Sequence, residues 1–262
     1  MPEVTIDDIR VSVAEGETIL TAAKKAGVWI PTLCYNAALS TNGSCRLCLV
    51  ELETGTGRRK LITACNYPVR GDCTVHVSSQ AATAARKGIM ELLLARSPES
   101  TELRELAAQM GIEGTPYPTV TESQRNCILC GLCVKVCDEV MGCSAIGFIG
   151  RGVNRTIATP FKLAADQCIV CGACAAVCPV GTIRIRIHEE TGEAEISPFK
   201  SRAKLLTCSG CGKRMVAQPL GEKTMVDVNM NWDEFRERAR LCPECRRKRA
   251  AESLALVEDK RL

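Results

Sequence analysis

The N-terminal part of the chain shows two different hydrophobic patterns. Apolar and polar residues alternate on either side of Asp7 and Asp8, with apolar residues at Val4, Ile6, Ile9, Val11 and Val13. A period of two around such a turn predicts a β-hairpin over residues 4–13. Residues 18–26 carry Ile19, Ala22, Ala23 and Ala26 at helical spacing, and the following Gly27 is typical of a residue that ends a helix. A small β-rich domain with one helix is therefore expected here.

Residues 80–110 show a helical pattern instead. One predicted helix carries apolar residues along one side, namely Ala81, Ala85, Ile89, Leu92 and Leu93. Ser97 and Pro98 interrupt it, and the sequence TELRELAAQM predicts a second helix. Further on, Ile146, Phe148 and Ile157 favour a hairpin, and Ile183, Ile185 and Ile187 alternate with arginines as in a half-buried strand.

The sequences CILCGLCVKVC at 127–137 and CIVCGACAAVC at 168–178 form an internal repeat with seven of eleven positions identical. Three thiolates spaced two residues apart can surround one face of a 4Fe-4S cube, while the fourth cysteine reaches the other cube. We therefore group Cys127, Cys130, Cys133 and Cys178 on one cluster, and Cys137, Cys168, Cys171 and Cys174 on the other. Gly131 and Gly172 are expected where the backbone passes close to a cluster. Zinc sites or disulfides are weaker alternatives for so complete a repeat.

Four further cysteines surround the N-terminal pattern, at Cys34, Cys45, Cys48 and Cys65. A loop with three cysteines and a distant fourth is typical of plant-type 2Fe-2S ferredoxins, although the first gap is longer here. A zinc site is the alternative. Cys73 and Cys143 fall outside these sets, and we interpret both as core thiols.

The C-terminal part contains two C-x2-C pairs, Cys208 with Cys211 and Cys242 with Cys245. Such pairs predict a tetrahedral zinc site, and a further iron–sulfur cluster is the alternative. Few large apolar residues accompany them, chiefly Met215, Val216, Leu220, Val226, Val228, Trp232, Phe235 and Leu241. The charged run 236–249 is interpreted as a solvated helix face or a docking surface.

Composition narrows the function classes. The chain has 262 residues with 18 cysteines, 3% aromatic residues and a net charge of +4. Its start lacks the features of a secretory signal, and no apolar run approaches the ~18–20 residues of a membrane span, so a reducing cytoplasmic setting is expected. The mild charge is no argument for nucleic acid. No P-loop, dinucleotide-binding glycine motif or nucleophile–base pair is evident, so no substrate-transforming site is predicted.

The sequences EGETILTAAKKAGVWIPTLCYN, GSCRLCLVE and LITACNYPV, followed by the paired motifs, resemble the N-terminal part of the large iron–sulfur subunit of NADH–quinone oxidoreductase. They equally resemble the small diaphorase subunit of NAD-linked hydrogenases and formate dehydrogenases. The resemblance covers roughly residues 1–190. It implies a flavoprotein partner that oxidises NADH or reduces NAD, and a further catalytic subunit. It also implies a His-and-three-Cys cluster near residues 95–114, where this chain has neither His nor Cys.

We therefore expect an α+β chain of four parts. These are a plant-type ferredoxin-like β-grasp domain at 1–78, a helical linker at 79–120, a bacterial-type domain with two 4Fe-4S clusters at 121–200, and a zinc-ribbon-like module at 201–262. The expected function is electron transfer through one 2Fe-2S and two 4Fe-4S clusters within a multisubunit NAD(H)-linked oxidoreductase. The alternative is a zinc-structured redox-sensing regulator or nucleic-acid-binding protein, which the low aromatic content and near-balanced charge disfavour.

Overall fold

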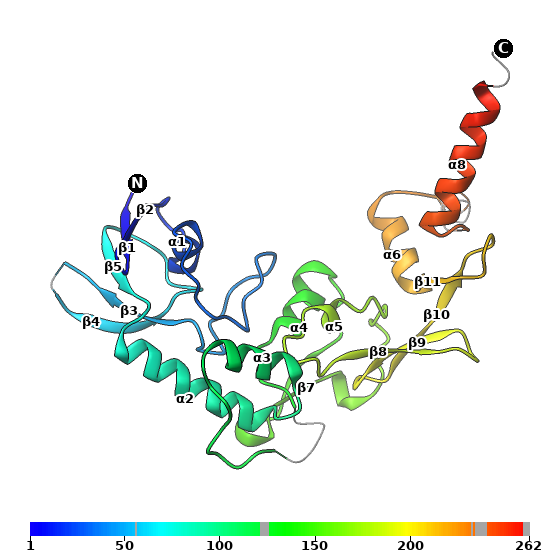
Figure 1. Ribbon diagram of the computed structural model, residues 1–262. Coiled ribbons are helices and arrows are strands. Elements are labelled where there is room, and N and C mark those ends of the chain that lie inside the picture. The colour runs from blue at the N-terminus through cyan, green and yellow to red at the C-terminus, as the bar shows by residue number, and fades with distance from the viewer. Residues whose placement is uncertain (56, 121–125, 232, 234–239, 259–262) are drawn as a thin grey trace. The chain divides into compact units, whose positions relative to one another are not determined.

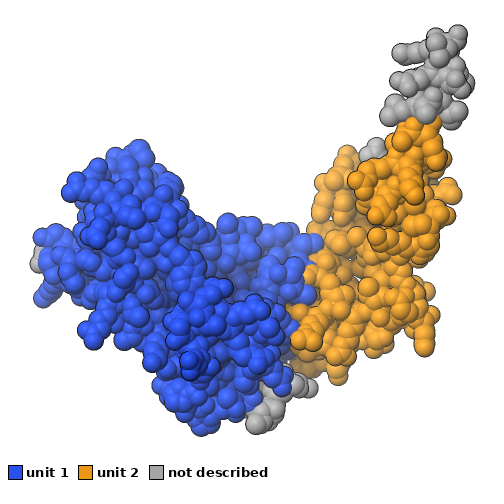
Figure 2. Space-filling view, in the orientation of Figure 1, with its two compact units in different colours: residues 1–142, 146–158, 173–182 blue, residues 143–145, 159–172, 183–262 orange. Residues whose placement is uncertain are grey.

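The computed structural model describes residues 1–55, 57–120, 126–231, 233 and 240–258 (Figure 1). Trp232, Phe235 and positions 236–239 of the predicted charged run therefore lie outside the described residues. The chain divides into two compact units, coloured separately in Figure 2. The first contains residues 1–142, 146–158 and 173–182, and the second contains residues 143–145, 159–172 and 183–262.

A five-stranded sheet forms the N-terminal part of the first unit. Its strands are β1 (Glu3–Ile6), β2 (Ile9–Ser12), β3 (Leu49–Glu53), β4 (Arg59–Thr63) and β5 (Cys73–His76), in the order β2-β1-β5-β3-β4. Strands β1 and β5 run parallel, and the other pairs are antiparallel. The predicted N-terminal hairpin is thus confirmed, and its alternating residues Val4, Ile6 and Val13 are fully buried.

Helix α1 (Ile19–Lys25) confirms the predicted helix and packs against this sheet. The Thr18 hydroxyl accepts a hydrogen bond from the Thr21 N–H at 3.2 Å, which satisfies a free donor of the first turn. Gly27 follows the helix with φ of +71°, a conformation that glycine adopts without steric cost. Ile19, Ala22 and Ala23 are fully buried in one core with the residues of β1 and β3.

Helices α2 (Gln80–Arg96) and α3 (Thr101–Gln109) confirm the two predicted helices. The serines that precede them, Ser79 and Ser100, accept hydrogen bonds from the first turn of each helix. The predicted apolar side of α2 is only partly correct, because Ile89 and Leu93 pack against a buried core whereas Leu92 is 55% exposed. The buried positions are Ala82, Arg86, Met90, Leu94 and Ala95.

Arg86 determines which side of α2 is most deeply buried. Its guanidinium donates hydrogen bonds to the carbonyl oxygens of Leu49 at 3.1 Å and Val77 at 2.7 Å. A charged residue is a poor candidate for a helix core face from sequence alone, because burial is costly unless its donors are satisfied. Here two backbone acceptors on the sheet satisfy them, and α2 turns its Arg86 side toward the sheet.

A second buried core joins α2 and α3 to the cysteine-rich segments of the first unit. Its fully or almost fully buried members include Leu47, Met90, Leu103 and Ala107. Short elements carry the rest of this unit: α4 (Leu132–Lys135), the π-helix η2 (Val136–Val140), β6 (Gly147–Ile149), η3 (Gly152–Asn154), β7 (Thr156–Ala158) and α5 (Ala173–Ala176). Strands β6 and β7 pair antiparallel, which confirms the predicted hairpin.

The second unit contains η4 (Pro160–Lys162) and a four-stranded antiparallel sheet with the order β11-β10-β9-β8. Its strands are β8 (Arg184–His188), β9 (Glu193–Ser197), β10 (Ser201–Thr207) and β11 (Arg214–Ala217), followed by α6 (Gln218–Asp227) and α8 (Pro243–Glu258). The predicted half-burial of β8 is wrong, because Ile185 and Ile187 are 47% and 53% exposed. Strand β8 lies at the sheet edge. Of the three alternating isoleucines, Ile183 is buried, and it lies just before the strand.

Among the described residues, no helix is both long and apolar enough to cross a lipid bilayer.

Candidate iron–sulfur and metal centres

The four N-terminal cysteines converge in the first unit. Cys34 and Cys45 lie in the loop between α1 and β3, Cys48 immediately precedes β3, and Cys65 follows β4. The pairing of β3 with β4 continues to the Ala64 N–H, which donates to the Cys48 carbonyl at 3.0 Å and brings Cys48 near Cys65. The Cys45 N–H donates to the Cys34 sulfur at 3.4 Å. All four side chains are at most 5% exposed.

Hydrogen bonds among these sulfurs show how closely the structure gathers them. Bonds from the Cys45 and Cys65 thiols lower the pKa of Cys34 to about 2. A bond from Cys65 likewise lowers the pKa of Cys48 to about 7, against the effect of burial. The pKa values of Cys45 and Cys65 are raised because they donate these bonds. A buried set of four soft sulfur donors, two of them inclined to ionise, fits a 2Fe-2S cluster.

The cysteines expected on the first 4Fe-4S cluster all lie in the first unit. Cys130 and Cys133 are buried, and Cys127 and Cys178 are half-buried. Burial raises the pKa of Cys127 and Cys133, and raises that of Cys130 to about 12. Cys178 is packed against the same buried core as Ile128 and Cys130, although it is more than forty residues further along the chain. The fold therefore brings the fourth cysteine of the second motif to the first motif, and these buried sulfurs fit a cluster.

The remaining four cysteines of the repeat are distributed over both units. Cys137 and Cys174 belong to the first unit, and Cys168 and Cys171 to the second. All four are half-buried. Their grouping on one cluster stays a prediction from their spacing.

Two glycines of the repeat adopt left-handed backbone conformations, with φ of +80° at Gly131 and +77° at Gly172. A Cβ atom at Gly131 would lie 3.1 Å from the Phe148 ring, and one at Gly172 would lie 2.3 Å from Ile185 Cδ1. Conformation and close side-chain neighbours thus both favour glycine at these positions.

The loop of the first centre contacts the segment that carries the second. The Ser40 N–H donates to a Glu139 carboxylate oxygen at 2.8 Å, and the Ser40 hydroxyl donates to the other oxygen. Lys135 donates to the Ser40 carbonyl at 2.6 Å, and Asn42 donates to the Cys130 carbonyl at 3.4 Å. Cys34, Cys45 and Cys130 share one buried core. Sequence reasoning missed these contacts, because Ser40 and Glu139 are 99 residues apart and neither has a local signal.

The C-terminal cysteines form a separate group in the second unit. The sulfur atoms of Cys208, Cys211, Cys242 and Cys245 all lie within 4.8 Å of one another, and those of Cys211 and Cys242 are 3.7 Å apart. The Cys242 N–H donates to the Cys208 sulfur at 3.2 Å and lowers the pKa of Cys208 to about 6. The Cys245 thiol donates hydrogen bonds to the sulfurs of Cys211, Cys242 and Cys208, which raises the pKa of Cys245 to about 12.

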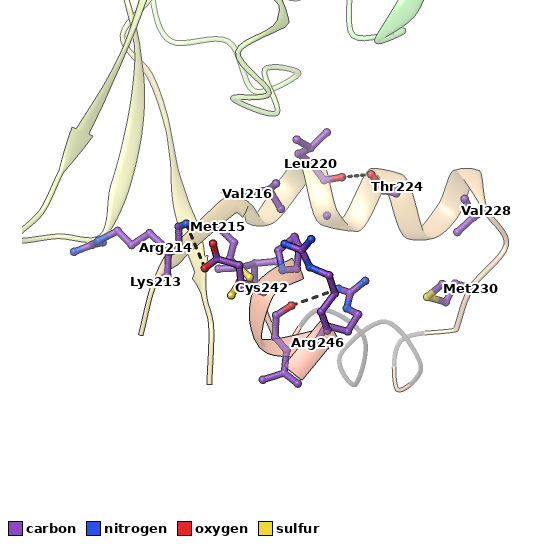
Figure 3. Close-up of a pocket in the computed structure, with 16 residues that line it drawn as sticks. Lys213, Arg214, Met215, Val216, Leu220, Thr224, Val228, Met230, Cys242 and Arg246 are labelled. Carbon is purple, nitrogen blue, oxygen red and sulfur yellow. Dashed lines mark hydrogen bonds and ion pairs between the residues drawn. The ribbon is translucent and has the colours of Figure 1, made fainter. Parts of the chain in front are cut away.

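A pocket lies beside this cysteine group (Figure 3). Its wall is mostly apolar, with Met215 and Val216 from β11, Leu220 from α6, and Leu241 and Cys242 before α8. Lys213, on its border, lies 4.0 Å from the Glu244 carboxylate. The pocket and the cysteine group therefore depend on the same turn before β11 and the same start of α8.

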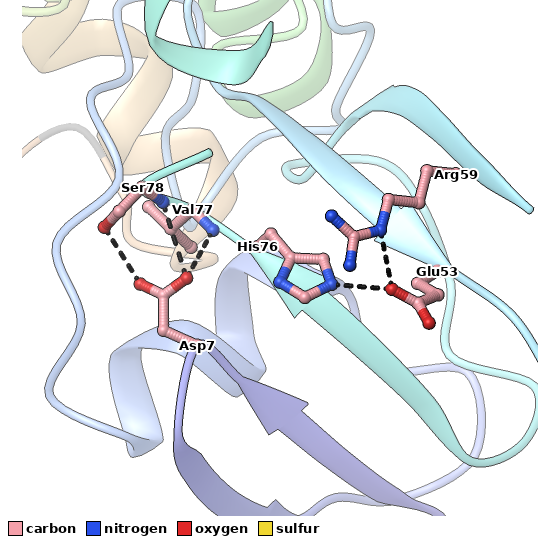
Figure 4. A network of polar contacts seen from close by, with 6 residues as sticks. All are labelled: Asp7, Glu53, Arg59, His76, Val77 and Ser78. Carbon is pink, nitrogen blue, oxygen red and sulfur yellow. Dashed lines mark hydrogen bonds and ion pairs between the residues drawn. The ribbon is translucent and has the colours of Figure 1, made fainter. Parts of the chain in front are cut away.

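The two remaining cysteines and both histidines have other surroundings. Cys73 is half-buried against the first core, where burial raises its pKa. Cys143 is half-buried in the second unit. His76 lies 2.9 Å from Glu53, which also accepts from Arg59 at 2.7 Å (Figure 4), and His188 lies 3.0 Å from Glu195. The histidines thus contact carboxylates on neighbouring strands.

Comparison with known proteins supports two iron–sulfur domains in this chain. Residues 2–80 match the family described as the 2Fe-2S iron-sulfur cluster binding domain, and residues 126–182 match the 4Fe-4S dicluster domain. The chain is a mixed α+β iron–sulfur protein with an N-terminal 2Fe-2S ferredoxin domain and a 4Fe-4S dicluster domain.

Its relatives are subunits of NAD(P)-linked oxidoreductases. The chain is 36% identical over 190 residues to NADP-reducing hydrogenase subunit HndD of Solidesulfovibrio fructosivorans, which covers 62% of this chain and 32% of that protein. It is 34% identical to NADPH-Fe(3+) oxidoreductase subunit alpha of Geobacter sulfurreducens, over 61% of this chain and 21% of that protein. It is 33% identical to the mitochondrial NADH-ubiquinone oxidoreductase 78 kDa subunit of Candida albicans, over 60% of this chain and 25% of that protein. The chain thus spans between a fifth and a third of the length of these relatives.

A solved structure shows the same similarity. One chain of an NAD+-reducing NiFe hydrogenase in the H2-reduced state superposes with a TM-score of 0.53 and 28% identity, covering 60% of this chain and 74% of that chain. These findings confirm the resemblance inferred from the N-terminal sequence and the paired motifs. They do not favour the regulatory or nucleic-acid-binding alternative.

Proposed function

We propose that this chain is an electron-transfer subunit of a multisubunit NAD(H)-linked oxidoreductase. The observation that carries the proposal is the direct contact between two cysteine sets, in which the loop holding Cys34 and Cys45 touches the segment holding Cys130. Clusters bound there would accept and release one electron at a time. The protein contributes burial, which excludes water, and the hydrogen bonds of Ser40 and Asn42, which hold the two segments together.

The proposal assigns each cysteine set a cluster. Cys34, Cys45, Cys48 and Cys65 would hold the 2Fe-2S cluster, and Cys127, Cys130, Cys133 and Cys178 the first 4Fe-4S cluster. Cys137, Cys168, Cys171 and Cys174 would hold the second. The parts would follow the predicted boundaries 1–78, 79–120, 121–200 and 201–262. The partners would be a flavoprotein that exchanges electrons with NADH and a catalytic subunit such as a hydrogenase or formate dehydrogenase, in the cytoplasm.

The proposal is tested on the native complex, purified without oxygen. We expect NADH to reduce the clusters of this chain within the complex, whereas the separated chain should be reduced by dithionite but not by NADH. Electron paramagnetic resonance would follow one 2Fe-2S and two 4Fe-4S signals. A chain that purifies alone, or whose clusters stay oxidised in an NADH-treated complex, would contradict the proposal.

We infer that the C-terminal group binds zinc. A tetrahedral ion with zinc–sulfur bonds of about 2.3 Å places its sulfur atoms roughly 3.8 Å apart. The 3.7 Å between the Cys211 and Cys242 sulfurs is close to that value, whereas a cube of four irons would hold its ligands further apart. Metal analysis should give about ten irons and one zinc per chain, and about fourteen irons without zinc would replace this inference by a further cluster.

A further inference from the structure

The corner between α2 and α3 holds the backbone that leads into the first cysteine motif. Arg96, the last residue of α2, donates from Nε to the Cys127 carbonyl at 2.8 Å. The hydroxyl of Ser97, which is fully buried, donates to the Asn126 carbonyl at 3.2 Å. The Asn126 side-chain amide donates to Glu99 at 2.9 Å. Three neighbouring residues of one corner therefore fix two residues of the motif.

The opposite side of this backbone is held by the second motif. The Thr182 hydroxyl also donates to the Asn126 carbonyl, and Thr182 stands only four positions after Cys178. The Asn126 carbonyl thus accepts hydrogen bonds from both Ser97 and Thr182. The corner is thus positioned against the residues proposed to hold the first 4Fe-4S cluster.

Arg96 also places a positive charge near a proposed ligand sulfur. The Cys127 carbonyl oxygen and its sulfur are joined by four covalent bonds, which span at most about 5 Å. Arg96 Nε, at 2.8 Å from that oxygen, therefore lies within roughly 8 Å of the sulfur.

We propose that Arg96 is a positioning residue that orients the first motif and raises the reduction potential of the 4Fe-4S centre held by Cys127, Cys130, Cys133 and Cys178. The proposal rests on the ligand assignment made under the proposed function. Reduction adds one electron to this centre and no bond forms or breaks, so its negative charge grows by one. A nearby cation stabilises the reduced form more than the oxidised form.

Two substitutions separate charge from hydrogen bonding. Arg96→Gln keeps a donor but removes the charge, and Arg96→Lys keeps the charge. The control is Arg104→Gln, because Arg104 is an exposed arginine of α3 whose donors reach Ser100 and Glu99 and no cysteine. The measurement is a redox titration of the whole chain, followed by electron paramagnetic resonance.

We expect Arg96→Gln to shift one of the two 4Fe-4S waves to a more negative potential. Arg96→Lys and Arg104→Gln should keep the wild-type potentials. An unshifted wave in Arg96→Gln, an equal shift in Arg104→Gln, or loss of the centre in both Arg96 variants would each overturn the proposal. Absence of 4Fe-4S signals from the wild-type chain would instead overturn the proposed function, so the two failures are distinguishable.

Discussion

Replacing Arg86 by Met should weaken the attachment of α2 to the five-stranded sheet. Arg86 is buried on α2, and its two hydrogen bonds reach Val77, just after β5, and Leu49, the first residue of β3. Leu49 directly follows the proposed cluster ligand Cys48. Methionine would fill a similar volume but leave both carbonyl oxygens without this donor.

The size of the effect follows from the two bonds. A hydrogen bond from a charged donor contributes about 1.5–3 kcal/mol, and the bond to Val77 is buried, whereas that to Leu49 is partly buried. Burial also lowers the pKa of Arg86, which shows that removing the guanidinium from water has a cost. The methionine variant avoids this desolvation cost, which offsets part of the stability lost with the two hydrogen bonds. We expect the free energy of unfolding to fall by about 2–4 kcal/mol.

Urea unfolding, followed by the visible circular dichroism of the 2Fe-2S centre after a fixed time, measures this change. With a slope of about 2 kcal/mol per molar urea, the midpoint should fall by roughly 1–2 M. The urea midpoint of Arg86→Lys should lie between those of the wild-type chain and Arg86→Met, because a single ammonium cannot match the planar fork of arginine. The control is Lys87→Met, since the Lys87 side chain is 63% exposed. An unchanged midpoint in Arg86→Met, or an equal fall in the control, would refute the reasoning.

Three further predictions concern other parts of the chain. Cys48→Ser should abolish the 2Fe-2S resonance signal and leave both 4Fe-4S signals, and loss of the latter would contradict the ligand grouping. Glu139→Gln should speed hydrogen exchange of the Ser40 amide, whereas the exposed control Glu105→Gln should leave it unchanged. Bonds from Ser40 lower the pKa of Glu139, so in the wild-type chain the Ser40 amide should stay protected from exchange above the ordinary carboxyl pKa and lose this protection only as pH falls below it. Cys208→Ser should make the C-terminal module protease-sensitive while electron passage between the other clusters survives, and blocked passage would refute the zinc inference.

Local signals in the sequence predicted much of the fold and the candidate ligands. The hairpin at 4–13 and helix α1 follow from short-range periodicity and from the residues that end each element. The cysteine sets follow from spacing, because a cluster requires several thiolates at defined intervals. The structure brings the N-terminal cysteines together and the C-terminal cysteines together, while their roles as ligands stay predictions.

Features that depend on partners distant in the sequence could not be predicted. The buried side of α2 is set by Arg86 and the carbonyl of Leu49, 37 residues earlier. The exposure of Ile185 and Ile187 depends on β8 being an edge strand, which alternation alone does not reveal. Arg96 and Cys127 are 31 residues apart, and nothing in either local sequence indicates their contact.

The α2–α3 corner explains how this chain can keep two helices without the His and Cys ligands of the cluster that the resemblance implied there. Met90 and Leu103 are fully buried and Ala107 nearly so, which supplies apolar burial where metal–thiolate bonds would otherwise contribute to folding. The same corner supports the first motif through Arg96 and Ser97. Residues 95–114 contain no His or Cys that could hold a further cluster. Under the proposed function, electrons therefore pass directly between the 2Fe-2S and first 4Fe-4S centres, whose segments meet at the contact made by Ser40 and Asn42.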